Sequence, residues 1–532
     1  MSLRNRDLSL LIFCTIFFSF ITVYLTGCKI RKKNKPITPT PIEGNIPSAD
    51  ISLLNYHPLE YGGSPEMRAV WITTIYALDW PKYRGTSQQI MQRQREELKN
   101  ILNQLKSNNI NTVFFQVRLR GDLLYPSKIE PQSSILTNNN TIKPDYDPLV
   151  YAVEEAHKRG IALHAWIVTY PLGNKSHIDQ LGYGAIAKRR PYWTIFHRGE
   201  YYLDPGNPEV RTFIAQIAAD IARRYDVDGI HFDYIRYPEG AETFNDRDSF
   251  QKYAPRGMSK ALWRERNISN QLKEVADSVR RIDNGILISA APIGRYRDIP
   301  GKRRIGWNCV ESVAQNPKVW FREGSVDFIA PMMYYKDDFF DPYLSDWKTQ
   351  MQGGTVIPGL GVYRTQDKSN WNAKDIERQI LLIRQTGLKG VAFYRQENIL
   401  PSNKGIYDVI KNEFAMPVRA LPFPNRALSI PGIPIFTSCY IKGTDLYLRW
   451  SMPNGRAVHK YNIFFNIYDR HGNPGEDYLF QASVKGEFLK IPLSIFPKKG
   501  KIHFRVEGSN KANVTGWASK PLVIDLKKYS FE

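Results

Sequence analysis

From about residue 66 to residue 415 the chain alternates short apolar runs with amphipathic helical stretches, and it does so eight times. We predict strands at 67–73, 112–118, 162–170, 229–237, 286–294, 327–335, 355–363 and 390–396. Helical periodicity follows at 90–109, 147–160, 208–227, 268–282 and 373–387. Strand and helix in regular alternation indicate parallel strands joined by right-handed crossovers. The eight repeats predict an α/β fold of the (β/α)8 or TIM-barrel type.

After Phe414 the pattern changes to one without helices. A Pro-rich connector over 417–430 leads to runs of period two at 445–450, 461–469, 501–510 and 521–526. Turn residues separate these runs, so we predict a small all-β sandwich over 431–532. The pattern is similar to a fibronectin type III or related immunoglobulin-like module, which implies spacing, docking or binding rather than catalysis.

The N-terminus predicts export and a lipid anchor. Arg4 and Arg6 precede an apolar run over 8–25, which ends in Leu-Thr-Gly-Cys with Cys28 last. This segment resembles a bacterial lipoprotein signal with its lipobox, which implies acylation of the Cys28 thiol after cleavage. The alternative is an uncleaved membrane anchor, because the run is nearly long enough to span a bilayer. In both cases most of the chain lies outside the cytoplasm.

We therefore predict a signal peptide over 1–28, an extended tether rich in Pro and Thr over 29–59, and the barrel over 60–416. The expected location is the cell envelope, where a lipid anchor would hold the chain facing the periplasm or the exterior. The membrane, through this anchor, is one expected partner. The sequence makes no prediction about protein partners.

Charge and cysteine usage exclude some functions. Lys and Arg number 73 against 52 Asp and Glu, a net charge of +21 that favours anionic surroundings. The basic residues stand beside acids in the helical stretches, so no nucleic-acid partner is predicted. Only Cys309 and Cys439 lie beyond the signal, in different predicted domains, which argues against a disulfide framework. Without HExxH, CxxC or Gly-rich phosphate motifs, no metal and no cofactor is predicted.

A barrel of this type carries its active site at the carboxyl ends of its strands, so inward polar residues there are candidates. In the fourth strand, Ile230 and Phe232 turn one way while His231 and Asp233 turn the other. By the same alternation the inward groups of other strands are Gln116, Arg118, His164, Trp166, Tyr334, Tyr394 and Gln396. Polar and aromatic groups from five strands thus converge on one mouth, which packing alone does not require.

Several segments, in order, resemble the glycosyl-hydrolase-like 10 family. They are EMRAVWITTIYALDWP (66–81), FFQVRLRGDLLYPS (114–127), HAWIVTYP (164–171), YLDPGNPEVR (202–211), VDGIHFDYIRYP (227–238), WRERNISNQL (263–272) and VDFIAPMMYY (326–335). The resemblance spans the barrel and implies a TIM barrel that acts on glycans of the bacterial envelope, peptidoglycan strands among them. Two departures bear on the site. Residues 168–171 replace an Asn-Pro-Tyr-Arg type sequence, and Tyr234 stands where many members have a second Asp.

Glycoside hydrolysis needs a proton donor at the leaving oxygen and a second group that attacks or activates water, usually two carboxyls. Asp233 is the leading candidate for one of them. The other is predicted to be Asp122, just past the second strand, or Glu397, just past the eighth. Asp204, in the sequence DPGNPEV, is either a substrate ligand or a cap of the helix that follows.

The remaining candidates are substrate ligands. The predicted set is Trp71, Gln116, Arg118, His164, Trp166, Asp204, His231, Tyr234, Arg236, Tyr334 and Tyr335. The aromatic members have faces suited to sugar rings, although each taken alone fits core packing as well. The two arginines are expected to meet carboxylate-bearing sugars or to hold a catalytic Asp ionised.

The sequence therefore predicts a lipid-anchored glycoside hydrolase whose partner is an envelope polysaccharide. A non-catalytic glycan-binding or scaffolding lipoprotein is the alternative, because the fourth strand ends in a single Asp. Transglycosylation or lyase chemistry on sugars would use the same groups, and a fold resemblance does not separate these reactions.

Overall fold

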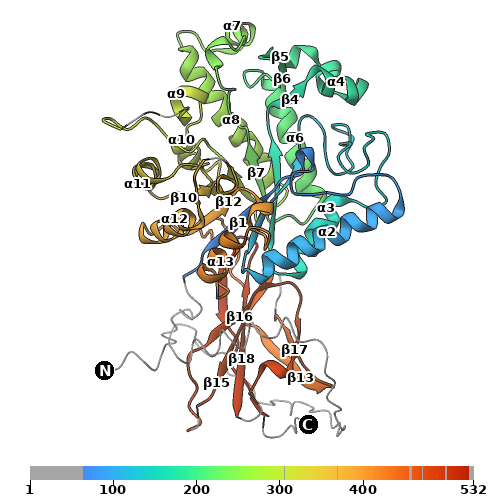
Figure 1. Cartoon of the computed structure of the whole chain (residues 1–532), viewed down its shortest axis with the longest axis vertical. Helices are drawn as coiled ribbons and strands as arrows, with labels where there is room; N and C mark the ends of the chain where they lie inside the picture. The colour runs from blue at the N-terminus through green and yellow to red at the C-terminus, as the bar shows by residue number, and fades with distance from the viewer. Residues whose placement is uncertain are drawn as a thin grey trace. The chain divides into compact units, whose positions relative to one another are not determined.

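The computed structural model describes residues 64–526, apart from 303, 305, 368, 454–457, 470 and 498–499. They form a barrel unit, made of Pro65–Phe414 and Ala420–Leu428, and a C-terminal unit that takes in Ala415–Arg419 and the chain from Ser429 (Figure 1). The predicted lipidation site Cys28, the signal peptide and the tether lie outside the described residues. None of the helices in the described part combines the length and apolar composition that a transmembrane span requires.

A nine-stranded parallel sheet forms the centre of the barrel unit. Its strands are β1 (Met67–Ile72), β2 (Thr112–Arg118), β3 (Ala162–Val168), β7 (Gly229–Asp233), β8 (Leu287–Ala290), β9 (Phe328–Ile329), β10 (Thr355–Val356), β11 (Gly359–Leu360) and β12 (Gly390–Phe393). They follow the order β10-β9-β8-β7-β3-β2-β1-β12-β11. Each predicted strand region contains one of these strands or, for 355–363, two.

The two outermost strands of this order, β10 and β11, belong to one short segment, 355–360. β10 pairs with β9, and β11 pairs with β12. Between them, Ile357 N donates to Ile329 O at 2.9 Å. The sheet therefore curls so far that its first and last strands come from this one segment. The fold is TIM-barrel-like, as predicted.

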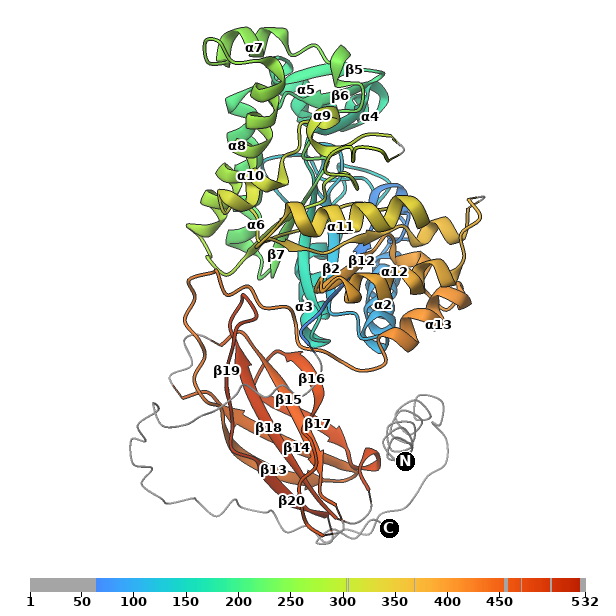
Figure 2. The ribbon, with the colours of Figure 1, turned by 90° about the vertical axis from the view of Figure 1, so that its left-hand side faces the viewer.

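Helices follow the strands and cover the outside of the sheet (Figure 2). They are α2 (Gln88–Ser107), α3 (Pro148–Lys158), α6 (Pro208–Arg224), α8 (Lys260–Arg280), α10 (Pro317–Arg322), α11 (Phe340–Gln350), α12 (Ala373–Gln385) and α13 (Lys404–Glu413). Local sequence sets where they begin. The side chains of Asp147 and Asn207 accept backbone N–H groups at the starts of α3 and α6, each followed by a proline at the first helical position.

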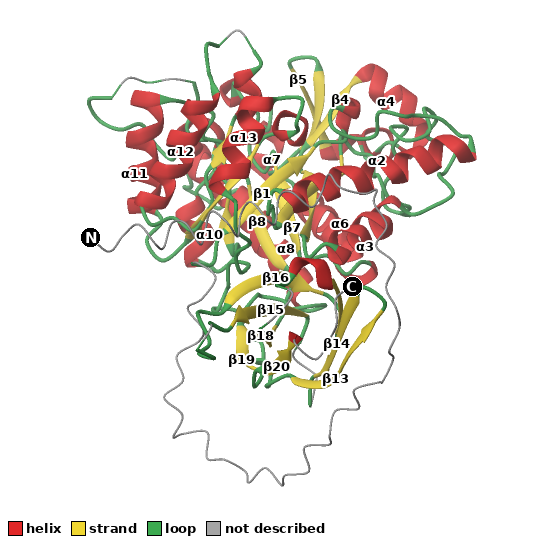
Figure 3. Cartoon of the chain, turned by 60° about the horizontal axis from the view of Figure 1, so that its bottom comes forward, coloured by secondary structure: helices red, strands yellow, loops and turns green. Residues whose placement is uncertain are grey.

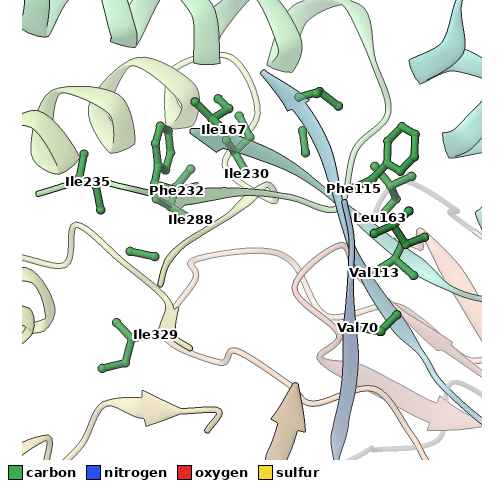
Figure 4. Close-up of a cluster of buried hydrophobic side chains, with 14 of the residues drawn as sticks. Val70, Val113, Phe115, Leu163, Ile167, Ile230, Phe232, Ile235, Ile288 and Ile329 are labelled. Carbon is green, nitrogen blue, oxygen red and sulfur yellow. The ribbon is translucent and has the colours of Figure 1, made fainter. Parts of the chain in front are cut away.

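Alternation along the strands separates two sets of side chains. One set belongs to a single apolar cluster with the helices and includes Val70, Val113, Phe115, Leu163, Ile167, Ile230, Phe232, Ile288 and Ile329 (Figure 4). The other set fills the barrel, where Phe114 stacks on His231 with centroids 4.1 Å apart. Gly229 leaves room in this interior, because a Cβ there would lie 2.2 Å from Nδ1 of His164.

Insertions build up the carboxyl end of the barrel. β4 (Pro171–Asn174) starts shortly after β3 and joins the antiparallel sheet β4-β6-β5, with β6 at Glu200–Leu203 and β5 at Thr194–His197. The helices α4 (Lys175–Leu181) and α7 (Arg247–Tyr253) lie at the same end in both Figure 1 and Figure 2, and Figure 2 also shows α5 (Ile186–Arg189) there. The strand ends of β1, β2, β3 and β7 thus have a built-up rim.

The C-terminal unit consists of antiparallel strands (Figure 3). One sheet has the order β13-β14-β17, from Ile435–Lys442, Asp445–Ser451 and Phe488–Pro492. The other has the order β16-β15-β18-β19, from Tyr478–Val484, Lys460–Ile467, Lys501–Ser509 and Thr515–Ala518, and β20 (Leu522–Asp525) also pairs with β18. Both sheets contribute to one buried cluster, for example through Trp450 and Phe504. Cys309 and Cys439 are free thiols.

Candidate active site

The fourth barrel strand, β7, ends at Asp233, earlier than the predicted 229–237. Tyr234 has a φ of +50°, a left-handed conformation that a strand does not continue through. The Asp233 carbonyl accepts the N–H and the hydroxyl of Thr169 at 2.9 and 2.8 Å. The Tyr234 N–H donates to Asp233 Oδ1 at 2.7 Å. This turn fixes the Asp233 carboxyl at the carboxyl end of the sheet.

Unpaired donors surround this carboxyl. Arg236 Nη1 lies 3.8 Å from Asp233 Oδ1, too far for a hydrogen bond. The buried Nε and Nη1 of Arg236 have no hydrogen-bond partner among the described residues. A buried donor without a partner costs about 1–3 kcal/mol. A polar ligand that entered here would recover that free energy.

Burial raises the pKa of the Asp233 carboxyl, and this effect outweighs the opposing influence of the Arg236 charge, the Tyr234 N–H and the Trp166 indole. The Asp233 side chain is 8% exposed. Asp233 therefore holds its proton to a higher pH than an exposed Asp does. A carboxyl of this kind is suited to donating a proton.

A second carboxyl, Glu239, lies on the other side of Arg236. Arg236 Nη2 donates to Glu239 Oε1 at 3.0 Å, so one guanidinium stands between Glu239 and Asp233. The Glu239 side chain is 27% exposed and its charge raises the pKa of Asp233. Glu239 is not among the residues that the sequence predicted for the site. The available signal was an acid in the loop after the fourth strand, where barrels of this type place reacting groups.

Tyrosines from three other strand ends lie beside Asp233. Tyr334 and Tyr394 stack with centroids 5.6 Å apart, and Tyr363 meets both edge-on. Burial, and next the Asp233 charge, raise the pKa of Tyr394 to about 12. Tyr234 is 41% exposed, and the Arg236 guanidinium lies 4.2 Å from its ring centroid. The structure thus brings Asp233, Trp166, Tyr234, Arg236 and Tyr334 together, as the sequence predicted them to be.

Three other predicted ligands belong to the barrel interior. Trp71 Nε1 donates to His231 Nε2 at 3.2 Å, so the His231 proton is on Nδ1, which faces Ser289 Oγ at 2.9 Å. Burial lowers the pKa of His231 well below its ordinary value, and the ring is neutral. His164 is 1% exposed and meets the rings of Phe114 and Phe328 edge-on. Trp71, His164 and His231 therefore pack below the mouth.

Arg118 is occupied inside the protein, contrary to the expected role as a substrate ligand. It forms a two-bond pair with Glu130, at 2.7 and 2.6 Å, and also donates to the carbonyls of Val168 and Thr169. Both charged side chains are 0% exposed. The physical reason is a register shift between Gln116 and Arg118 in the pairing of β2 with β3, which breaks the alternation used for the prediction.

Gln116, two residues before Arg118, also has a partner within the protein. Its Oε1 accepts the backbone N–H groups of Thr74 and Ile75 at 2.9 and 2.8 Å. The Thr74 hydroxyl donates to the Gln116 carbonyl at 3.0 Å. Gln116 therefore holds the loop that follows β1.

The other predicted acids lie apart from Asp233, each with partners of its own. Burial alone would raise the pKa of Asp122, but His177, Ser133 and the Arg120 N–H outweigh burial and lower this pKa. Glu397 lies 2.9 Å from Arg395 Nη2 and 3.6 Å from Lys82 Nζ.

Asp204 and Tyr335 also have local contacts. Asp204 accepts from Gly206 N at 2.8 Å and from the Ser249 hydroxyl, and burial raises its pKa to about 6. The helix cap at this turn is Asn207 rather than Asp204. Tyr335 packs against the outer apolar cluster and lies beside Arg295. In the part of the chain that the structure describes, no three His, Cys, Asp or Glu side chains gather as metal ligands would.

Comparisons of the sequence with known proteins point to one family. The sequence profile of the glycosyl hydrolase-like 10 family matches residues 66–370. Glycosyl hydrolase YngK of Bacillus subtilis (strain 168) is 27% identical over 367 residues, which cover 65% of this chain and 71% of that protein. Glycosyl hydrolase DigH of Escherichia coli (strain K12) is 30% identical over 356 residues, 63% of this chain and 78% of that protein.

A solved structure is also similar. The glycoside hydrolase domain of PgaB (BpsB) from Bordetella bronchiseptica matches with a TM-score of 0.46 at 14% identity, covering 65% of this chain and 99% of that chain.

The Arg118–Glu130 pair generates a stability prediction. Glu130→Gln leaves the buried Arg118 charge without its counterion, so we expect the free energy of unfolding to fall by about 3–5 kcal/mol. Asp179→Asn removes the exposed partner of Lys175 and Lys188, and we expect this control to lose much less, because solvent screens exposed pairs. Urea unfolding followed by tryptophan fluorescence measures both. Equal losses in the two variants would show that the buried pair has no special role.

Proposed function

This chain belongs to the glycosyl hydrolase-like 10 family and is an enzyme of the glycoside hydrolase class, and on that premise we propose that it cleaves an envelope glycan, peptidoglycan strands included. The observation that carries the proposal is the placement of Arg236 between the carboxyls of Asp233 and Glu239. Two carboxyls on either side of one guanidinium are several ångströms apart. Glycoside hydrolases use carboxyl pairs separated by about 5–9.5 Å.

The two carboxyls have different environments and therefore different roles. Asp233, with its raised pKa, donates its proton to the glycosidic oxygen as the bond from that oxygen to the anomeric carbon breaks. Glu239, more exposed and paired with Arg236, either accepts a proton from the attacking water or attacks the anomeric carbon itself. Water supplies the hydroxyl of the new reducing end. Arg236 positions both carboxyls and stays charged throughout.

The aromatic groups beside Asp233 bind the sugar in this proposal. Tyr234, Tyr334 and Tyr394 present rings and hydroxyls next to the carboxyl, and the Trp166 indole lies beside it too. Amphipathic rings of this kind suit sugars, which have apolar C–H faces and polar rims. Asp122 and Glu397 take no part in the proposed carboxyl pair, because each has other partners. Glu397 pairs with Arg395 and Lys82, and Asp122 lies 3.7 Å from His177 Nε2.

We also propose that the chain is a lipoprotein of the cell envelope, anchored through Cys28. The support is the lipobox in the sequence. The C-terminal unit is proposed as a fibronectin type III-like module that spaces the barrel or binds glycan. In support, its first, second and fifth strands form one sheet, and its other strands form the second.

Substitution of the carboxyls tests the enzymatic proposal. Asp233→Asn cannot donate the proton, so we expect the release of reducing ends from peptide-free peptidoglycan to fall by about 10²–10⁴-fold. Glu239→Gln removes the second carboxyl and should cause a loss of similar size. The matched control is Glu397→Gln, expected to stay within a few-fold of the unaltered protein.

A single assay with all three variants decides among the outcomes. Circular dichroism checks that each variant is folded. No reducing ends from any envelope glycan with the unaltered protein would reject hydrolysis and favour a binding role. Loss of activity in Glu397→Gln but not in Glu239→Gln would reject the carboxyl pair.

The pH dependence tests the role of Arg236. Only protonated Asp233 is active, so kcat/KM should decrease as pH rises through the Asp233 pKa. Arg236 lowers that pKa, and Arg236→Gln should therefore move the alkaline limb of the profile upward by about one pH unit. Arg236→Lys keeps the charge and should keep the limb near its original position. A limb that stays in place or moves to lower pH in Arg236→Gln contradicts the assignment.

The anchor has its own test. Cells that express the full chain, grown with a clickable fatty acid, should incorporate the label into the protein and retain it in the membrane fraction. Cys28→Ser should abolish labelling, because the thiol is the acylated atom, whereas Cys439→Ser should have no effect. Labelling that persists in Cys28→Ser rules out this site.

A further inference from the structure

A cavity of about 190 Å³ opens beside the loops that follow β1 and β2, at the carboxyl end of the barrel. Its lining includes Tyr76 and Arg84 after β1, Arg120 and Asp122 after β2, and His177 from α4. Pockets that bind drug-sized ligands have volumes of about 300–1,000 Å³, so this cavity is smaller. The cavity therefore suits one sugar residue or a substituent of a sugar, rather than an oligosaccharide.

The cavity carries positive charge that the protein does not neutralise. Neither Arg84 nor Arg120 forms an ion pair within the described part of the chain, and Arg120 Nε is buried without a hydrogen-bond partner. Asp122 is the single acid in the lining and is already engaged by His177, Ser133 and the Arg120 N–H. The lining thus has two guanidinium groups and one carboxylate, which already has partners. This excess of positive charge favours binding of an anion. Guanidinium groups match carboxylates in two-bond geometry.

The loop beside the cavity is strained and presents an aromatic ring. Tyr76 and Ala77 have successive φ angles of +56° and +54°, a left-handed backbone conformation that residues other than glycine rarely adopt. Gln116 holds this conformation through the N–H groups of Thr74 and Ile75. Tyr76 is 64% exposed, with the Arg120 guanidinium 4.9 Å from its ring centroid. The strain thus keeps a large ring in solvent beside two cations.

We propose that this cavity is an additional sugar-binding position, which accepts a sugar residue that bears a carboxylate. Arg120 and Arg84 bind the carboxylate and Tyr76 packs on the sugar ring. The proposal rests on the proposed function, since it places this sugar in the same glycan whose bond is cleaved beside Asp233. The carboxylate is either that of a uronic acid or that of a carboxyalkyl ether on the sugar.

Binding to the full-length Asp233→Asn protein in detergent tests the proposal without turnover. Calorimetry compares a peptide-free peptidoglycan tetrasaccharide with its carboxyl-reduced derivative, which has an alcohol in place of each carboxylate. We expect the acidic form to bind about tenfold more tightly, a difference of about 1.4 kcal/mol. Adding Arg120→Gln or Arg84→Gln should bring this ratio close to one. Arg256→Gln, the same change at an exposed position outside the lining, should leave it at about tenfold.

Each outcome bears on one proposal or the other. A ratio near one in the parent, or a tenfold ratio that survives Arg120→Gln in a protein with unchanged circular dichroism, overturns the carboxylate site. Tight binding of a hyaluronan tetrasaccharide as well supports the site and indicates that any sugar carboxylate is accepted. Preferential binding without any hydrolysis by the unaltered protein supports the site but rejects the proposed function. Hydrolysis with equal KM for both tetrasaccharides supports the proposed function but rejects the carboxylate site.

Discussion

Parallel pairing around a closed circuit is the constraint on which the rest of the barrel unit depends. The segment 355–360 pairs with β9 through β10 and with β12 through β11, so it joins the two ends of the sheet. Because all strands run the same way, their carboxyl ends lie at one end of the sheet. Below that end the interior is filled by Trp71, Phe114 and His231. The packed interior therefore acts as the floor of the site.

Two buried acids at the carboxyl end of the barrel, Asp79 and Asp233, differ in how closely an arginine pairs with them. Burial raises the pKa of both Asp79 and Asp233. Asp79, however, accepts from the N–H groups of Thr73 and Glu397 and pairs with Arg395 at 2.5 Å, so it fastens loops together. Beside Asp233, Nε and Nη1 of Arg236 have no hydrogen-bond partner among the described residues. At Asp79 these partners offset the cost of burial, whereas the Asp233 carboxyl stays available to a ligand.

Arg118 and Arg120 lie at the end of the second strand, two residues apart, but they have different surroundings. Arg118 pairs with Glu130 and is 0% exposed. Arg120, two residues on, faces a cavity and has no ion pair within the described residues. A buried guanidinium requires an opposite charge and hydrogen-bond acceptors, which Glu130 and two carbonyls supply. Composition alone does not distinguish these two positions.

Local periodicity determined the barrel, because apolar alternation and helix caps such as Asp147 are properties of neighbouring residues. It also predicted that Asp233, Arg236, Tyr234 and Tyr334 lie at one end of the barrel, since the strands run in one direction. Only the tertiary structure decided that Arg118 turns to Glu130 and that Glu239 shares Arg236 with Asp233. The register shift in β2, the left-handed Tyr234 and the contacts between distant segments set these outcomes. Such features depend on three-dimensional packing that no local pattern contains.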